Sequence, residues 1–325
     1  MASLTMIQAI NQALDLALAT DERVMVLGED VGPNGGVFRA TEGLYEKYGG
    51  QRVVDTPLAE SAIVGSAVGL ALGGMRPVAE IQFLGFIFEA MDQMSTQASR
   101  LRFRSQGRHH VPLVVRAPYG GGVRTPEIHS DSLEALFSHL PGLKVVTPST
   151  PYDAKGMLLA SIRDPDPVLF LEPMRLYRAG RQEVPEAWYE VPLGEARVVR
   201  TGDDVTLIAY GPMVPVAEAA ADSLASAGIS AEVVDVRTLS PLDLETLTQS
   251  VTKTGRAVIV HEAQRTGGLG AEIAASLQER AFLSLEAPIT RVTGYDTPFP
   301  MPALEDWWLP DVERVKAAAE FVLHY

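Results

Sequence analysis

Short apolar runs alternate with longer segments of helical length along the first half of the chain. The runs are rich in Val, Ile, Leu and Phe, a composition typical of buried strands. They comprise residues 23–29, 51–57, 76–83, 111–118, 143–149 and 167–173. Most segments between them are Ala-rich or repeat about every 3.6 residues, as helices do. This alternation predicts a parallel α/β sheet with helices as crossover connections.

Residues 150–167 show how clearly a helix can be delimited in this sequence. Thr150 and Pro151 supply a start signal, and Asp164 and Pro165 supply a stop signal. An apolar face follows the helical period through Ala154, Met157, Leu158 and Ser161. We therefore predict a helix between these two signals.

A second α/β region follows a stretch without a sustained period. Between residues 172 and 200 the chain is rich in charge, Pro and aromatic residues. Strand-like runs then return at 204–211, 229–241, 255–263 and 289–298, with helical segments such as 215–228 and 268–282 between them. The prediction is a first domain of residues 1–180, a linker of residues 181–201 and a smaller α/β domain of residues 202–325.

Composition narrows the class of protein. The chain has 325 residues, 46% of them hydrophobic, and a net charge of -14, which repels nucleic acid and anionic membrane. It contains no cysteine, which excludes disulfides, thiolate zinc sites and thiol nucleophiles. The first residues lack a basic leader, and no apolar run reaches the length of a membrane span, about 18 residues. We therefore expect a cytoplasmic protein without nucleic acid or membrane partners.

Familiar nucleotide and hydrolase motifs are missing, and one glycine-rich segment remains. The sequence has no G-x-x-x-x-G-K-[ST], G-x-G-x-x-G after a strand, H-E-x-x-H or G-x-S-x-G. Residues 117–132, APYGGGVRTPEIHSDS, follow a predicted strand and so lie at its carboxyl end, where open α/β sheets bind ligands. Taken alone, a run such as Gly120–Gly122 is more often just a flexible turn.

His129, in this segment, is the histidine with most chemical interest. Its imidazole titrates near neutral pH and can donate or accept a proton, although a hydrogen-bonded surface histidine would look the same. We expect the other histidines to be surface residues: His109, His110, His139, His261 and His324. The adjacent His109 and His110 lack the spaced third ligand of a metal site.

Glu60 is the one carboxylate before fifteen uncharged residues, Ser61–Met75. In a first helical turn its anion gains about 0.3 to 1 kcal/mol from the helix dipole, which would be reason enough for its position. However, Gly65, Gly69 and Gly73 follow at intervals of four, and each interior glycine costs about 1 kcal/mol relative to alanine. The stripe favours close packing of another backbone. If that contact buries Glu60, desolvation favours a protonated or proton-sharing carboxyl.

These residues resemble a known motif. Glu60, Gly65 and Gly69 match the E-x-x-x-x-G-hydrophobic-x-x-G pattern of thiamine diphosphate enzymes, with Ser66 at the hydrophobic position. The whole chain resembles the β subunit of the heterotetrameric decarboxylating component of 2-oxo acid dehydrogenase complexes. The segments that carry this resemblance are 28–44, 55–63, 79–93, 120–136, 141–158 and 284–300. It implies a transketolase-like fold, with a pyrimidine-binding domain followed by a C-terminal α/β domain.

The resemblance also implies roles for individual residues. Glu60 would hydrogen-bond N1′ of the cofactor's aminopyrimidine and promote formation of its carbon nucleophile. Phe86 would stack on the pyrimidine, Leu58 and Gln82 would line its pocket, and His129 would act near the substrate or the acyl-accepting lipoyl group. By composition alone, Phe86 and Leu58 would be core residues, and Gln82 would be a hydrogen-bonding residue at a strand end.

A monovalent cation site is implied less directly. In the family, main-chain carbonyls hold potassium at positions that correspond here to Val111, Leu113, Ser161, Asp164 and Asp166. Some relatives offer a threonine side chain where this sequence has Val114.

Half of the expected cofactor site is absent from the sequence. The G-D-G motif followed by N-N, which holds magnesium and the diphosphate in this class, does not occur; GDD at 202–204 has no asparagine pair after it. The resemblance therefore implies an α subunit that holds the magnesium diphosphate in an α2β2 heterotetramer. It also implies a dihydrolipoyl acyltransferase core, with its lipoyl domain, as partner.

Three functions are compatible with these features. The first is a 2-oxo acid dehydrogenase β subunit, which takes part in oxidative decarboxylation and reductive acylation of the lipoyl group. Residues 84–88 and 126–132 look more like pyruvate-type relatives, whereas 293–300 also fits branched-chain ones. The second is a subunit like the C-terminal half of a split transketolase or deoxyxylulose-phosphate synthase, for which more basic residues near the substrate would be expected. The third is a non-catalytic scaffold, against which the presence of both Glu60 and His129 argues.

Overall fold

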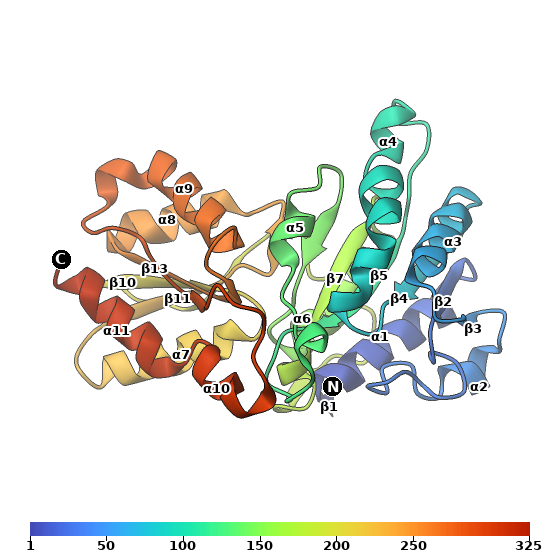
Figure 1. The fold of residues 1–325 in the computed structure, drawn as a ribbon, viewed down its shortest axis with the longest axis horizontal. Coiled ribbons are helices and arrows are strands. Elements are labelled where there is room, and N and C mark those ends of the chain that lie inside the picture. Colours follow the sequence, from blue (N-terminus) through green and yellow to red (C-terminus); the bar gives the residue numbers. More distant parts are fainter. The chain divides into compact units, whose positions relative to one another are not determined.

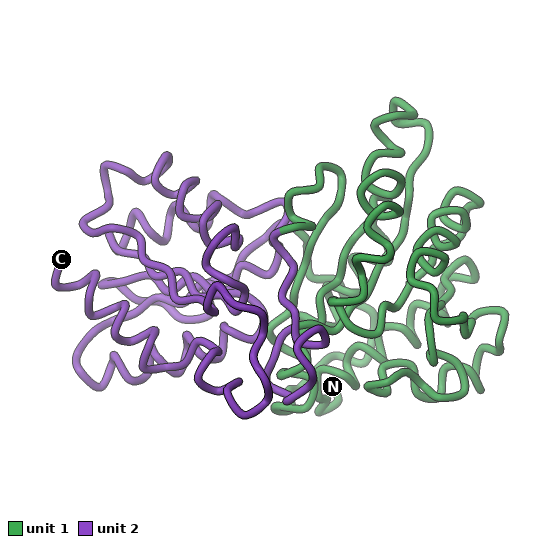
Figure 2. Tube along the Cα trace, viewed as in Figure 1, with its two compact units in different colours: residues 1–119, 136–193 green, residues 120–135, 194–325 purple.

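The computed structural model describes residues 1–325 and divides them into two units (Figure 2). The first unit comprises residues 1–119 and 136–193, and the second comprises 120–135 and 194–325. These boundaries differ from the predicted 1–180, 181–201 and 202–325 at two places. Residues 120–135 join the second unit because their backbone amides bond to carboxylates late in the sequence. Of the predicted linker, the part up to residue 193 joins the first unit, because Val184 pairs with Ala2 and Val191 lies in the first core.

The first 193 residues contain a parallel sheet, as predicted. In chain order their elements are β1 (Ala2–Leu4), α1 (Met6–Thr20), β2 (Val24–Gly28), α2 (Leu44–Tyr48), β3 (Val53–Asp55), α3 (Glu60–Leu72), β4 (Arg76–Glu80), η1 (Leu84–Ala90), η2 (Gln93–Ala98), α4 (Leu101–Arg104), β5 (Val114–Tyr119), η3 (Glu127–His129), α5 (Glu134–Ser138), β6 (Lys144–Val146), α6 (Pro151–Arg163), β7 (Val168–Pro173), η4 (Met174–Leu176) and β8 (Gln182–Val184). The parallel strands of the first unit follow the order β6-β7-β5-β4-β2-β3. All six predicted strands of this region are present.

Helices α1 and α6 pack against each other and close the core of the first unit (Figure 1). Helix α6 begins where predicted, with the Thr150 side chain accepting the Asp153 amide and Pro151 at the first helical position, and Asp164 caps its end. Leu14 of α1 and Leu158 of α6 are fully buried in one cluster with residues of the strands. This packing fixes the sheet from which the candidate site projects.

The last 132 residues build a second sheet. In order they form β9 (Arg197–Arg200), β10 (Val205–Ala209), α7 (Met213–Ala225), β11 (Ala231–Asp235), β12 (Thr238–Ser240), α8 (Leu244–Thr254), β13 (Ala257–Gln264), α9 (Leu269–Ala281), η5 (Phe282–Ser284), β14 (Thr290–Gly294), η6 (Pro302–Leu304), α10 (Glu305–Trp308) and α11 (Val312–Leu323). Five strands follow the order β14-β13-β10-β11-β9, and β9 is an antiparallel edge strand. The predicted α/β architecture is confirmed here too.

Side chains of β10 alternate between the two faces of this sheet. Leu207 belongs to the buried cluster of α7 and α11, whereas the Thr206 hydroxyl hydrogen-bonds Ser250 and Thr254 of α8. Figure 1 shows α7 and α11 on one side and α8 and α9 on the other. None of the chain's helices combines the length and apolar character needed to cross a membrane.

Candidate functional site

Three neighbouring strands of the first unit end at one edge of the sheet. In the parallel register, Gly28 at the end of β2 lies opposite Asp55 of β3 and Glu80 of β4. The residues that follow these strands therefore leave the sheet at its carboxyl edge, where open α/β sheets bind ligands. The predicted site residues Leu58, Glu60, Gln82 and Phe86 all follow β3 or β4.

A buried ionic network fixes the same strand ends. Arg116 of β5 donates to the Glu80 carboxylate over 2.7 Å and to the Glu172 carboxylate over 2.6 Å. Tyr177 completes the network by donating to Glu172 over 2.5 Å. Burial raises the pKa of Glu80, and the Arg116 charge opposes this shift. Because the network spans β4, β5 and β7, it holds the edge that carries Gln82 and Phe86 in register.

Glu60 is the first residue of α3, and its exposed fraction is 9%. The preceding Ala59 cannot cap the helix with its side chain, so the Glu60 carboxylate is the negative group in the first turn. The turn before it is tied to β2 by the Thr56 amide, which donates to the Gly28 carbonyl over 3.0 Å. The sequence thus places one nearly buried carboxyl at the sheet edge.

The structure also brings Glu29 close to Glu60, which the sequence analysis missed. Burial raises the pKa of Glu29, and the negative charges of Asp30 and Glu60 raise it further. The negative charge of Glu60 therefore favours the retention of a proton on Glu29. The signal was available in the sequence, since Glu29 directly follows a buried strand that ends at the same edge.

The other predicted cofactor residues present an apolar and aromatic surface. Leu58 is 72% exposed. Phe86 is half-buried, and its ring meets Phe83 edge-on at a centroid distance of 5.7 Å. The Gln82 amide donates to the Asp30 carboxylate over 3.2 Å. The expectation from composition that Leu58 is a core residue is therefore wrong, whereas its exposure fits a residue that contacts a ligand or partner.

Helix α3 has an uncharged outer face. Ser61, Ala62, Ser66 and Gly69 are all exposed. A Cβ atom at Gly69 would meet nothing within 4 Å, and one at Gly65 would lie 3.5 Å from the Gln93 side chain. Gly73 is the C-cap of α3, so the predicted stripe has two interior glycines, not three. The space above Gly69 is open to another chain.

His129 ends the short 3-10 turn η3 and belongs to the second unit, whereas Glu60 belongs to the first. Its loop is closed locally by the His129 amide, which donates to the Pro126 carbonyl over 2.9 Å. The hydroxyls of Thr125 and Ser130 lie 2.7 Å apart across the same turn. Hydrogen bonds within the turn therefore hold the glycine-rich segment in place, and this segment carries the half-buried His129.

The residues predicted to hold a monovalent cation lie around the start of β5 and the end of α6. The carbonyls of Val111, Leu113 and Ser161 each accept one backbone amide, which leaves each of these oxygens a second lone pair. Asp164 accepts the Asp166 amide over 2.9 Å and pairs with Lys144 over 2.5 Å. The Asp166 Oδ1 atom is buried without a hydrogen-bond partner. A carboxylate oxygen in that state fits a cation ligand.

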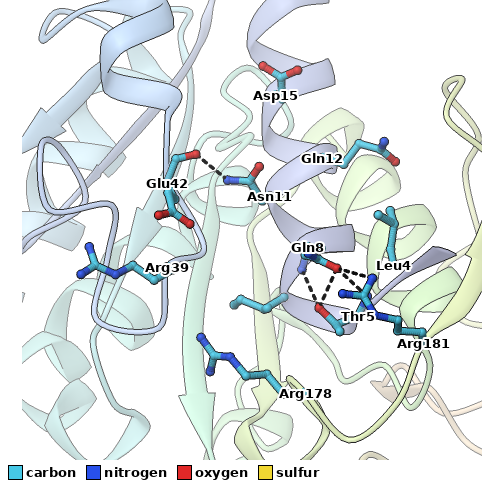
Figure 3. A pocket seen from close by; sticks show the side chains of 11 residues that line it. Leu4, Thr5, Gln8, Asn11, Gln12, Asp15, Arg39, Glu42, Arg178 and Arg181 are labelled. Atoms are coloured by element: carbon cyan, nitrogen blue, oxygen red, sulfur yellow. Dashed lines mark hydrogen bonds between the residues drawn. The ribbon is translucent and has the colours of Figure 1, made fainter. Parts of the chain in front are cut away.

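The cavity of the first unit that lies beside α1 contains none of the predicted site residues. A cavity of about 720 Å³ lies beside α1 (Figure 3). It is lined by Leu4, Thr5, Ile7, Gln8, Asn11, Gln12, Asp15, Arg39, Glu42, Arg178 and Arg181. Gln8 is already bonded there to Thr5 and Arg181. Leu58, Glu60, Gln82 and Phe86 instead follow the ends of β3 and β4.

One histidine departs from its predicted environment. His109, His110, His139 and His324 are exposed, as expected, but His261 is fully buried on β13. Burial lowers the pKa of His261 to about 4, and the ring stacks on Tyr210 with 6.0 Å between centroids. The prediction of a surface position was wrong because α9 covers β13 at this point through Gly268 and Gly270, where a Cβ would contact the imidazole.

Comparisons with known proteins show the family of this chain. The family described as "Transketolase, pyrimidine binding domain" matches residues 2–180, and "Transketolase, C-terminal domain" matches residues 194–315. The chain is 57% identical over 325 residues to the pyruvate dehydrogenase E1 component subunit beta of Bacillus subtilis, with 100% of both chains covered. It belongs to the family of pyruvate dehydrogenase E1 component β subunits. The Staphylococcus epidermidis relative of the same name is 56% identical, with 99% of this chain and 100% of that protein covered.

Solved structures place this family member among transketolase-like folds. A split-gene transketolase, described as an inactive β4 tetramer, has a TM-score of 0.81 at 26% identity and covers 99% of both chains. A transketolase from Pichia stipitis has a TM-score of 0.72 at 14% identity over 100% of this chain and 46% of that one, which shows the shared fold alone. The predicted fold class is confirmed. The much higher identity to the dehydrogenase subunits favours them over the split transketolase.

Proposed function

We propose that this chain forms the aminopyrimidine half of a thiamine diphosphate site in a 2-oxo acid dehydrogenase that prefers pyruvate. The observation that carries this proposal is the sheet edge around Glu60. A nearly buried carboxyl opens an uncharged helix there, beside the exposed Leu58 and the half-buried ring of Phe86. A carboxyl, an aromatic face and an apolar contact are what an aminopyrimidine ring needs.

The side chains have distinct roles in this proposal. Bound thiamine diphosphate supplies a carbon nucleophile for 2-oxo acid decarboxylation. Glu60 would share a proton with N1′ of the aminopyrimidine, while Phe86 would stack on the ring and Leu58 and Gln82 would line its pocket. His129 holds or donates a proton near the substrate or the lipoyl group.

An α subunit completes the site in the proposed α2β2 heterotetramer. This chain has no G-D-G motif with a following N-N, so the α subunit holds magnesium and the diphosphate. The name of the relatives, subunit beta of an E1 component, supports a role as one of two kinds of chain. The acyl group passes to the lipoyl domain of a dihydrolipoyl acyltransferase core.

Potassium binding is a separate part of the proposal. The main-chain carbonyls of Val111, Leu113, Ser161, Asp164 and Asp166 would bind it, and the unpartnered side-chain Oδ1 of Asp166 supports a cation there. The thermal midpoint of unfolding should rise in potassium chloride relative to the chloride of a bulky organic cation, and Asp166→Ala should abolish that difference. An identical rise in the Asp166→Ala variant would contradict this site.

Calorimetric titration with thiamine diphosphate and magnesium tests the shared site. We expect weak binding to the purified chain, weak binding to its α subunit, and tight, magnesium-dependent binding to their mixture, because each half alone leaves part of the ligand in water. The mixture should also decarboxylate 2-oxo acids. Tight binding and turnover by this chain alone would contradict the proposal, and tight binding by the mixture without turnover would favour a scaffold.

A further inference from the structure

Two buried carboxylates of the second unit hold the loop that carries His129. Glu262, near the end of β13, and Glu305, at the start of α10, are 2% and 1% exposed. The Gly121 amide donates to Glu262 Oε1 over 2.5 Å. The Gly122 amide donates to Glu305 Oε1 over 2.9 Å, and the Arg124 amide donates to Glu305 Oε2 over 3.1 Å. Three amides of one short loop therefore bind two carboxylates from distant parts of the sequence.

Close packing leaves this loop little freedom. Gly120 has a φ of +82°, and a Cβ there would lie 3.0 Å from Glu262 Oε1. A Cβ at Gly121 would lie 2.4 Å from the ring of Phe299, which is itself buried against Trp308. Both positions therefore require glycine, the first for its backbone conformation and the second for space. A displacement of the loop would break the amide bonds and strain this contact.

Further bonds anchor both ends of the turn that contains His129. On the amino-terminal side, the Arg124 guanidinium pairs with Asp306 over 2.5 Å. On the carboxyl-terminal side, Ser132 approaches Glu262 Oε1 at 3.5 Å, and Tyr210 donates to Glu134 over 2.8 Å. Residues 125–131, with His129 among them, span these anchors. These bonds hold the turn from both sides.

We propose that Glu262 and Glu305 are positioning residues that fix the His129 loop in its working conformation. Burying two carboxylates against backbone amides costs solvation, and apolar side chains would fill the same space without that cost. Unlike apolar side chains, carboxylates accept hydrogen bonds and so fix the orientation of the backbone amides of Gly121, Gly122 and Arg124. The inference rests on the proposed role of His129 in the reaction, and these glutamates act only through that residue.

Glu305→Gln is the primary test, because glutamine keeps the size of the side chain but has one acceptor oxygen for two amides. In the enzyme reconstituted with its α subunit, kcat should fall about tenfold or more, since small misplacements of a reacting group are costly. The affinity for thiamine diphosphate should be unchanged. Glu313→Gln, an exposed site on α11, makes the same charge change and should leave kcat unaltered.

A double-mutant cycle separates positioning from general destabilisation. Glu305→Gln should cause no further loss of kcat in a His129→Ala background, because the group it positions is already absent. Losses that multiply in the double variant would overturn the proposal. Wild-type turnover by His129→Ala alone would contradict the role of His129 itself, and the positioning role would fall with it.

Hydrogen exchange gives a readout that does not depend on activity. Amides of residues 121–131 should exchange faster in Glu305→Gln than in the unaltered chain, while those of β10 and β13 stay protected. Unchanged exchange in residues 121–131 would show that Glu305 does not hold the loop, even if His129 proves essential. Failure of the positioning role is thereby distinguished from failure of the proposed function.

Discussion

The carboxyl of Glu60 has a neighbour that an ordinary helix-opening carboxylate lacks. Glu29 lies close enough for the Glu60 charge to raise its pKa, so the two carboxyls and Asp30 form a negatively charged corner at the sheet edge. A protonated ring nitrogen of a ligand would be stabilised beside them.

Glu60→Gln should lower kcat by about two decades or more in the reconstituted enzyme at saturating thiamine diphosphate, because the amide cannot share the carboxyl proton. The circular dichroism spectrum should be unchanged. Glu46→Gln, in the first turn of α2 and exposed, is the matched control and should retain full activity. Near wild-type turnover of Glu60→Gln would contradict the role of this carboxyl.

His261 makes the stability of the fold depend on pH. Its pKa is lowered to about 4 in the folded chain from a usual value of 6.5, so the unfolded chain binds a proton first as pH falls. The contribution of His261 to the free energy of unfolding is fully present above pH 6.5 and is lost as the pH falls towards 4. At about 1.4 kcal/mol per unit, this histidine accounts for a loss of about 3 kcal/mol.

Urea unfolding at several pH values measures this effect. His261→Phe keeps a flat ring beside Tyr210 and should show a smaller decrease in unfolding free energy between pH 6.5 and pH 4. His324→Gln, at an exposed position, should behave like the unaltered chain in the same range. An equal decrease in His261→Phe would exclude this histidine as the cause.

The outer face of α3 is uncharged, and the space above Gly69 is open. Gly69→Leu should leave the isolated chain as stable as before, or more stable by up to about 1 kcal/mol, because a Cβ at this position meets nothing within 4 Å and glycine is a poor helix former. Assembly with the α subunit should weaken at least tenfold, as measured by analytical ultracentrifugation. Ala219→Leu, exposed on α7, adds bulk elsewhere and should assemble normally. Normal assembly of Gly69→Leu would rule out α3 as a contact face.

Elements with a sustained period were predictable from sequence. The apolar runs of β2, β4 and β13 and the start and stop signals of α6 are local properties, and the structure contains these elements. The pair β1 and β8 was missed because each strand has only three residues and the two strands are far apart in the sequence, although they are neighbours in space. No local pattern reports a pairing over that separation.

At the site, the sequence could identify chemical groups but not their surroundings. Glu60 and His129 were found from a motif and a loop, whereas Glu262 and Glu305 follow Gly121 by 141 and Gly122 by 183 residues. Nothing near either glutamate indicates which amides it accepts. The burial of His261 was missed because no local pattern shows that the start of α9 packs on its ring at Gly268 and Gly270.

For the molecule as a whole, a comparison of two 2-oxo acids tests the proposed preference for pyruvate. We expect kcat/KM for pyruvate to exceed that for 3-methyl-2-oxobutanoate in the reconstituted enzyme. Each extra methylene changes discrimination by only about 1 to 3 kcal/mol in an apolar pocket, so branched-chain acids should remain secondary substrates. A tenfold preference for 3-methyl-2-oxobutanoate would reverse this assignment.

The division of the chain at residues 119–120, 135–136 and 193–194 also bears on how such proteins can change in evolution. Recombination at residue 194 would join the loop of Gly121 and Gly122 from one parent to the Glu262 and Glu305 of another. The recombinant protein would be active only where both parent sequences have these carboxylates and glycines at the same positions. Residues 120–135 and 194–325 must therefore evolve together. Residues 194–325 cannot be exchanged without the His129 loop that they support.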